Sequence, residues 1–374
     1  MIPRPSENYS RQSVAAFGKT LANSVLFSWI LALPMAGLAA DTLAPALPVV
    51  KLAAGISGLD VQKALDLLPD SGGMVDLPAG IINVSEPIVL RRNDETLCGA
   101  GASTILFLAD GANCPVVILG QPVNHPQQTI KGLCLSDLFI DGNRLHQQRE
   151  LWRLQGEGSE IRNNGITVQD VSDSIIEGVT SARCRSGGLV TTLGVRRLTV
   201  RDFTSFDNQF DGLACYLTMD SMFTKLFLHN NPGAGISLDL AFNHNVVANA
   251  VLAANDLGIF MRSSRNNQFA DISIRQSHHY GVFMAQSWEK TIAGLQPALQ
   301  TQCTDNCFTN LAASQCGGAA FRINDLECTN NIIVSPRFTG DLAGLSLARP
   351  DLLGDRVVLG PIQPAAMHLV TAAN

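Results

Sequence analysis

A glycine followed by a short apolar strand recurs along the middle of the chain at a nearly constant interval. The repeats begin at Gly165, Gly188, Gly212, Gly235, Gly258, Gly281 and Gly318, at spacings of 23, 24, 23, 23, 23 and 37 residues. The last spacing equals one repeat plus an insertion of about 14 residues, near residues 287–301. A regular period of this length predicts supersecondary units that stack on one continuous core.

Each repeat carries a second alternating segment, such as Leu198-Thr199-Val200 or Ile272-Ser273-Ile274. Asparagine recurs where the turns are expected, and it tolerates turn backbones and can hydrogen-bond a neighbouring coil. These asparagines are Asn208, Asn231, Asn255, Asn267, Asn306 and Asn331. Short strands joined at polar corners predict an all-β fold, a right-handed parallel β-helix with about 23 residues per coil. A β-sandwich is the alternative, but it does not require a constant period.

The sequence before the repeats divides into an expected linker and a cap. Residues 41–56 are expected to be a linker and residues 57–80 an N-terminal cap, followed by coils over 81–337. Val61, Ala64, Leu65 and Leu68 share one face, and Pro69 stops the pattern, so a short helix is expected here. A helix would cover the open end of the coil stack. Residues 338–374 lose the pattern and are expected to form a C-terminal cap or tail.

Residues 1–40 have the layout of a secretory signal peptide. Arg4, Arg11 and Lys19 precede an apolar run that ends in small residues before Asp41. A single membrane anchor is the alternative, because the run is nearly long enough to span a bilayer. We expect cleavage and export to the periplasm or beyond, and no integral membrane segment in the mature chain.

The charge of the chain argues against nucleic acid as a partner. The whole chain carries −6, and the leader holds three basic residues and one acidic residue. Its removal leaves 23 basic and 31 acidic residues, or −8. Such a chain lacks the basic footprint that phosphate backbones require.

Strand parity predicts which side chains face outward. The first and third residues after each glycine are mostly apolar and are expected in the core, so the second and fourth point outward. The fourth-position column contains Tyr216, Asp239 and Arg262 on three successive coils about 4.8 Å apart. We expect these three to form one outward patch, flanked by Asp211 and Tyr280.

This patch has the side chains that uronate chemistry needs. Arg262 could neutralise a sugar carboxylate, and Tyr216 or a histidine could then transfer a proton. Alternatively, Asp211 and Asp239 could form the carboxylate pair of a glycoside hydrolase. A structural alternative also stays open, because Asp239 and Arg262 could simply be an ion pair between coils.

Further residues are candidates for substrate contacts. They are Arg322 in the fourth-position column, Tyr280 and His279 at a corner, and Trp152 in a polar excursion over residues 141–158 that also holds Arg144, Glu150 and Arg153. Phe260 and Phe283 also point outward, and we expect the 287–301 insertion to cover them. No metal or cofactor is expected: two outward carboxylates fall short of the six to eight oxygens of a calcium site, although water could supply some, so calcium stays open.

The cysteines follow the same register. Cys303 and Cys328 occupy equivalent offsets in consecutive coils, which places them within disulfide range. We predict a Cys303–Cys328 disulfide, which an oxidising compartment would permit. Cys215 falls at a core position and is expected to be a buried free thiol.

Two stretches resemble the pectate-lyase-like superfamily of polysaccharide-acting β-helix enzymes. The run Asp60-Val61-Gln62-Lys63-Ala64-Leu65-Asp66 and the following Gly-Gly-x-Val-x-Leu-Pro-Ala-Gly look like its N-terminal cap and first coil. The middle coils resemble the mannuronan C-5 epimerases, in particular at Phe210-Asp211-Gly212 and Asp220-Ser221-Met222-Phe223. The likeness covers most of residues 57–335 and implies a parallel β-helix that acts on polysaccharides.

One departure separates the chain from the epimerases. They carry an Asp-Pro-His-Asp motif one coil earlier, where this chain has Val190-Thr191-Thr192-Leu193. Epimerase chemistry of that type is therefore not expected. The sequence predicts an exported carbohydrate-active protein, with a polysaccharide lyase or related uronate-acting enzyme as the first hypothesis. A glycoside hydrolase and a non-catalytic glycan-binding or structural β-helix are the alternatives.

Overall fold

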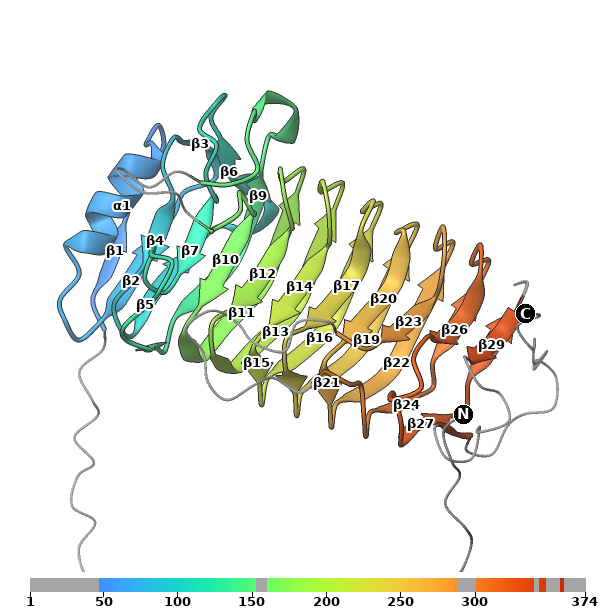
Figure 1. Cartoon of the computed structure of the whole chain (residues 1–374). Helices are drawn as coiled ribbons and strands as arrows, with labels where there is room; N and C mark the ends of the chain where they lie inside the picture. The colour runs from blue at the N-terminus through green and yellow to red at the C-terminus, as the bar shows by residue number, and fades with distance from the viewer. Residues whose placement is uncertain (1–46, 153–159, 288–300, 340–342, 348–356, 360–374) are drawn as a thin grey trace, which may run out of the picture. The chain divides into compact units, whose positions relative to one another are not determined.

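The structure is a computed structural model that describes residues 47–152, 160–287, 301–339, 343–347 and 357–359. These residues all belong to one compact unit, which begins at Ala46. The chain winds through successive parallel coils, which lie side by side in sequence order (Figure 1). The expected right-handed parallel β-helix is confirmed. No helix within the described ranges is long and apolar enough to cross a membrane.

One sheet of ten parallel strands takes a single strand from each coil. The strands are β4 (Ile88–Leu90), β7 (Val117–Leu119), β10 (Ile166–Gln169), β12 (Leu189–Thr192), β14 (Leu213–Tyr216), β17 (Ala234–Asp239), β20 (Leu257–Arg262), β23 (Val282–Ala285), β26 (Ala319–Ile323) and β29 (Ala343–Leu347). Their register follows the glycine repeat: Ile166 pairs with Leu189, Leu189 with Leu213, and so on to Val282. The sequence period therefore equals the coil length.

The remaining strands of each coil form a larger parallel sheet. They are β1 (Val49–Lys51), β2 (Gly73–Asp76), β3 (Gly80–Val84), β5 (Glu95–Cys98), β6 (Thr104–Leu108), β8 (Ile130–Lys131), β9 (Cys134–Asp141), β11 (Val171–Ala182), β13 (Val195–Phe206), β15 (Thr218–Met219), β16 (Met222–His229), β18 (Phe242–Asn243), β19 (Val246–Ala253), β21 (Ser264–Arg265), β22 (Gln268–Arg275), β24 (Cys307–Thr309), β25 (Ala312–Ser314), β27 (Asn331–Val334), β28 (Arg337–Thr339) and β30 (Val357–Leu359). Short 3₁₀ turns lie at Gly101–Ser103 and Arg144–His146.

The corners of the coils are held by stacked asparagines. Asn231 is buried, and its Oδ1 accepts hydrogen bonds from the backbone N and the Nδ2 of Asn208 at 3.2 and 3.0 Å. Asn255 repeats both contacts with Asn231 on the next coil, at 3.0 Å each. The residues just before them adopt the left-handed backbone that asparagine tolerates, as at Asn230 (φ 55°). The expected turn role of the asparagines is confirmed.

The core follows the expected parity. The first and third residues after each glycine, such as Leu213 and Cys215 on β14, are fully buried. Phenylalanines from the larger sheet fill the same interior, with the rings of Phe269 and Phe308 stacked 4.4 Å apart. Cys215 is a buried free thiol, as expected.

A short helix closes the N-terminal end of the coils (Figure 1). Helix α1 (Gly58–Asp66) begins in a capping box, where the Ser57 N–H donates to Asp60 Oδ2 at 3.0 Å. It buries Val61, Ala64 and Leu65 against the core. The Gln62 side chain of this helix bonds both the N–H and the carbonyl of Val89 on β4, so it satisfies a strand that would otherwise lie at the edge of its sheet. The expected capping helix is confirmed.

The structure differs from two expected boundaries and from one expected position of the repeat. Residues 49–51, inside the expected linker, form β1, which pairs with β2. On β26, Phe321 pairs with Val282, so Ala320 and not Gly318 continues the glycine column. The insertion therefore shifts the register by two residues, which preserves parity. At the other end, β28, β29 and β30 extend the coil pairing past residue 337. The predicted leader and most of the predicted tail lie outside the described residues.

Candidate functional site

A cleft with two lobes lies on the outer face of β10, β12 and β14. The Asp211 lobe has a volume of about 640 Å³ and is lined by Glu160, Arg162, Ser186, Gly187, Val190, Thr192, Leu193, Phe210, Asp211, Ala214, Tyr216, Leu217 and Leu240. The smaller Gln169 lobe is lined by Asn124, Glu160, Ile161, Arg162, Asn164, Thr167, Gln169, Val190, Thr192, Leu193 and Tyr216. The lobes share Glu160, Arg162, Thr192 and Tyr216, so they form one continuous cleft. The larger lobe is in the size range of small-ligand sites.

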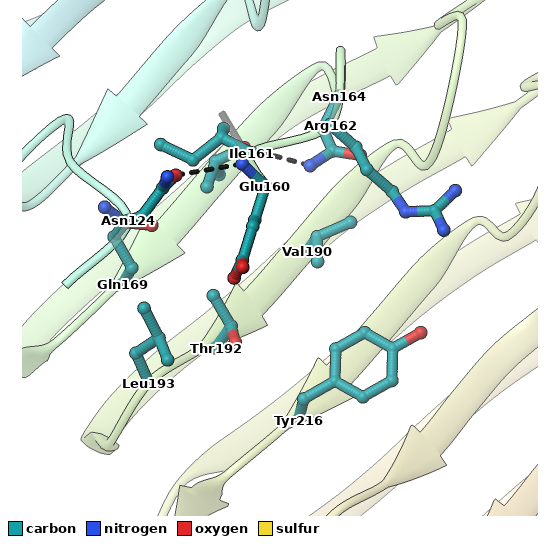
Figure 2. A pocket seen from close by; sticks show the side chains of 11 residues that line it. Asn124, Glu160, Ile161, Arg162, Asn164, Gln169, Val190, Thr192, Leu193 and Tyr216 are labelled. Carbon is teal, nitrogen blue, oxygen red and sulfur yellow. Dashed lines mark hydrogen bonds between the residues drawn. The ribbon is translucent and has the colours of Figure 1, made fainter. Parts of the chain in front are cut away.

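The wall of the cleft comes from the segment that precedes β10. Leu151 and Arg162 form an antiparallel bridge, and the Trp152 N–H donates to the Ile161 carbonyl at 2.9 Å. The Glu160 N–H donates to Asn124 Oδ1 at 2.9 Å, which ties this segment to a neighbouring loop. In Figure 2 the side chains of Glu160 and Arg162 point to different parts of the cleft, Glu160 toward Thr192. Residues 160–162, tied to Leu151 and Asn124, thus form a wall of the cleft.

Asp211 is the acidic group of the larger lobe. It sits just before β14, and its Oδ1 accepts a hydrogen bond from the Ala234 N–H of the next coil at 2.7 Å. Burial raises the pKa of Asp211 to about 6, against the opposing effects of that hydrogen bond and of Arg162. A carboxyl group with a pKa near neutrality can act as an acid or a base at physiological pH.

Tyr216 lies at the end of β14 and lines both lobes. Burial, followed by the charge of Asp211, raises the pKa of Tyr216 to about 12. The phenol is therefore neutral at physiological pH and can donate a proton. Ser237, one coil further on, partly opposes this rise in the pKa of Tyr216.

Arg162 is the cation of the cleft. Its guanidinium is ion-paired with Glu150 and lies over the Phe210 ring, 5.7 Å from the centroid. It also interacts electrostatically with both Asp211 and Tyr216. A cation, a titrating carboxyl and a neutral phenol therefore share one cavity.

The floor of the Gln169 lobe consists of buried uncharged groups. Asn164 Nδ2 donates to Thr167 Oγ1 at 3.0 Å, and its Oδ1 accepts from the Gly187 N–H at 3.1 Å. Gln169 Nε2 donates to the carbonyls of Gln121 and Val123. These bonds fix the floor between three coils.

The Tyr216–Asp239–Arg262 column exists as a stack in space. Tyr216 pairs in register with Asp239, and Arg262 is ion-paired with the Asp239 carboxylate. Asp239 is only 2% exposed, and its Oδ1 also accepts from the Leu240 N–H at 2.8 Å. Only Tyr216 of the three lines the cleft, together with the expected neighbour Asp211.

The predicted substrate-contact residues lie away from the cleft lining. His279 is ion-paired with Asp256 at 2.6 Å, and the Tyr280 ring lies 5.4 Å from that of Phe283. Arg322 follows Phe283 in the second-position column because of the register shift, and it donates to Ser346 Oγ at 2.5 Å. Trp152 packs partly buried against the core. Arg153 and most of the 287–301 insertion lie outside the described residues.

The predicted disulfide is not formed in the structure. Cys303 and Cys328 are free thiols and both are fully buried, and the Cys303 thiol donates to the Ala285 carbonyl at 3.5 Å. Burial, with Cys328 beside it, raises the pKa of Cys303, and the neighbouring Cys303 lowers the pKa of Cys328. Their equivalent place on consecutive coils is as predicted.

Sequence reasoning missed Glu160 and Arg162. Both precede the first clear repeat, where the period gives no register, and they reach the cleft because Arg162 forms an antiparallel bridge with Leu151. The sequence pattern could have indicated Gln169 and Thr192 as cleft residues. They are the first two members of the fourth-position column that also contains Tyr216.

A family model described as periplasmic copper-binding protein (NosD) matches residues 127–294. Copper sites need several histidine, cysteine or carboxylate ligands around one point. Within the described parts of the chain, no three such side chains come together in a way that could hold a metal ion. The described residues therefore do not form a copper site of this kind.

Curated relatives include mannuronan C5-epimerases of Azotobacter vinelandii. AlgE3 is 27% identical over 188 residues, which are 48% of this chain and 10% of AlgE3. AlgE5 is 27% identical over 205 residues, which are 52% of this chain and 20% of AlgE5. The chain thus spans a tenth to a fifth of the length of these relatives. The resemblance noted in the sequence is confirmed at low identity.

Solved structures with the same fold include an epimerase module and phage proteins. The A-module of AlgE4 from Azotobacter vinelandii aligns with a TM-score of 0.52 at 16% identity, over 83% of this chain and 98% of the module. ORF18 of Geobacillus virus E2 aligns with a TM-score of 0.60 at 13% identity, over 81% and 58%. The enzymatically active domain of tailspike protein 2 of bacteriophage CBA120 aligns with a TM-score of 0.56 at 14% identity, over 77% and 43%. These likenesses establish the parallel β-helix fold.

Proposed function

We propose that the protein binds a polysaccharide in the two-lobed cleft and cleaves it by elimination at a uronate residue, as a polysaccharide lyase does. The observation that carries the proposal is the convergence of Arg162, Asp211 and Tyr216 on one cavity. Relatives named as mannuronan epimerases and a tailspike enzyme domain with the same fold support a carbohydrate ligand.

The three side chains supply the parts of an elimination. Arg162 binds the sugar carboxylate, which lowers the cost of removing the proton on the adjacent carbon. Ionised Asp211 accepts that proton, and the electron pair forms a carbon–carbon double bond as the glycosidic oxygen leaves. Tyr216 gives its proton to the leaving oxygen, and the phenolate regains a proton from Asp211 or water.

Asp239 and Arg262 have a supporting role in this proposal. The Asp239 side chain is only 2% exposed, so Arg262 cannot leave it for a substrate carboxylate without stranding a buried charge. The side chains of Arg162 and Glu150 are 53% and 32% exposed, so Arg162 can exchange Glu150 for a substrate carboxylate. The pair lies one coil beyond Tyr216 and fixes the neighbouring backbone. His279, Tyr280 and Arg322 lie on later coils, and we assign them outer contacts with a longer chain, with Trp152 supporting the wall.

Hydrolysis is the second candidate, because Glu160 provides another carboxylate in the same cleft as Asp211. In that reaction Asp211 would be the protonated acid and Glu160 the partner carboxylate. The earlier pairing of Asp211 with Asp239 is less suited, since Arg262 already engages Asp239. A glycan-binding role without catalysis would use the same cleft.

A pH profile separates the two reactions. Elimination needs ionised Asp211, so its rate rises with pH through about 6, whereas hydrolysis needs protonated Asp211 and falls over the same range. The purified protein is incubated with anionic and neutral polysaccharides, and unsaturated products and reducing ends are both measured. Asp211→Asn, Tyr216→Phe and Arg162→Gln should each lower turnover by about 100-fold or more.

The matched control is Asp271→Asn, which changes an exposed carboxylate on β22, away from the cleft. Its activity should equal that of the wild type. If reducing ends form without unsaturated products, the reaction is hydrolysis and not elimination. Glycan binding without any turnover would leave only the binding role.

The location of the protein belongs to the same proposal. We expect export, with the leader of residues 1–40 removed, because the proposed polysaccharide substrate lies outside the cytoplasm. Fractionation of expressing cells, with N-terminal sequencing of the exported protein, tests this. A start near Asp41 in the periplasm or medium is the expected result.

A further inference from the structure

Arg162 and Glu160 line both lobes of the cleft, whereas Asp211 lines only the larger one. Among the described lining residues, Arg162 is the single cation of both lobes, and Glu150 already pairs with it. The carboxylates of Asp211 and Glu160 line the cleft as well, Glu160 in both lobes. Because both partners are partly exposed, Arg162 can exchange Glu150 for one substrate carboxylate, and the described lining offers no second cation for another.

Glu160 controls the Gln169 lobe by its position. Its exposed side chain points toward Thr192 on β12, on the other side of the cleft from the Arg162 guanidinium (Figure 2). Below it, Asn164, Thr167 and Gln169 are at most 2% exposed and are held by hydrogen bonds within the protein. Glu160 and Thr192 are thus the groups best placed to meet a sugar in this lobe.

The chemistry of a carboxylate sets what that sugar can be. An ionised carboxylate only accepts hydrogen bonds, so Glu160 can receive the hydroxyl protons of a neutral sugar. A uronate in the same place would bring a like charge close to Glu160. At about 4 Å, such repulsion weakens binding by about tenfold or more.

From this arrangement we infer that the substrate is a mixed polysaccharide, in which the uronate that reacts in the Asp211 lobe is followed by a neutral sugar in the Gln169 lobe. The inference rests on the proposed function, and it narrows the substrate class from any polyuronate to chains with both kinds of sugar. Glu160 is the residue that determines this specificity. A polymer of uronate alone is a poor ligand.

Calorimetric binding of two oligosaccharides of equal length tests the inference. One alternates glucuronate with glucose, and the other contains glucuronate only. The wild type should bind the alternating chain about tenfold more tightly. Glu160→Gln should reduce this preference to less than about threefold, mainly by improving binding of the glucuronate-only chain. Glu86→Gln, an exposed glutamate on the coil of β3 and β4, is the matched control and should keep the full preference.

Equal or tighter wild-type binding of the glucuronate-only chain would overturn the inference, as would an unchanged preference in Glu160→Gln. The proposed function would survive either result if elimination still depends on Asp211 and Tyr216. Binding of neither chain would overturn both. A folded state of Glu160→Gln equal to that of the wild type, by circular dichroism and thermal unfolding, excludes misfolding as the cause.

Discussion

Arg262 on β20 is ion-paired with Asp239 on β17, and the Asp239 carboxylate is almost completely buried beneath the guanidinium. Arg262 also lies over the Phe260 ring of its own strand, 5.2 Å from the centroid. The ion pair therefore links two neighbouring coils next to the cleft. Arg162, which precedes β10, is the cation that lines the cavity.

Removing Arg262 should destabilise the fold more than an exposed ion pair would. Arg262→Met removes the cation that is ion-paired with the buried Asp239 carboxylate, and the free energy of unfolding should fall by about 2–4 kcal/mol. Urea unfolding at pH 7 measures this change. The double variant with Asp239→Asn should recover part of the loss, because the amide keeps the acceptor for the Leu240 N–H. An equal or larger loss in the double variant would contradict a charge-pairing role.

Asp211→Asn should stabilise the protein at neutral pH. Because burial raises the pKa of Asp211 to about 6 in the folded state, the folded protein prefers the protonated form, and stability is lost as pH rises from about 4 to about 6. The amide mimics the protonated form, so the variant should gain up to about 3 kcal/mol at pH 7 and nothing below pH 4. Urea unfolding across this pH range measures the difference. A gain that is the same at both ends would show that Asp211 carries no such shift.

Cys303 and Cys328 should form a disulfide during oxidative refolding but not readily after folding. Adjacent coils lie about 4.8 Å apart, which suits the Cα separation of a disulfide. Both thiols are fully buried, so an oxidant reaches them only in the unfolded or partly folded chain. The bond should add about 3 kcal/mol to stability. Thiol counting and peptide mapping after refolding with and without oxidised glutathione test this, and Cys303→Ser is the control.

Asn231→Ala should destabilise the fold through the corner stack. The change removes the acceptor for two donors of the fully buried Asn208, so the loss should be about 1–3 kcal/mol. Gln128→Ala removes an exposed amide and should stay within about 0.5 kcal/mol of the wild type. Guanidinium unfolding compares the two variants. If the loss of unfolding free energy is no larger than that of the control, water replaces the hydrogen bonds between Asn208 and Asn231.

The repeat alone determined the coil, its length and its inner and outer faces. A strand period of two and a coil period of 23 residues leave one way to bury Leu213 and Cys215 together while Tyr216 faces outward, so these features follow from local pattern. The same repeat spacing places Cys303 beside Cys328 and Asn231 at a corner of the coil.

The tertiary structure decided what the outward residues contact. Arg162 and Glu160 reach the cleft through the bridge between Leu151 and Arg162, a fold-back that no period encodes. Because Ala320 and not Gly318 continues the glycine column after the insertion, Arg322 lies in the second-position column and not in the fourth. The partner of Asp239 and the pKa of Asp211 depend on burial and on neighbours from other coils, which exist only once the chain has folded. The sequence therefore determined the scaffold, and the packing of non-repeating segments against it determined the site.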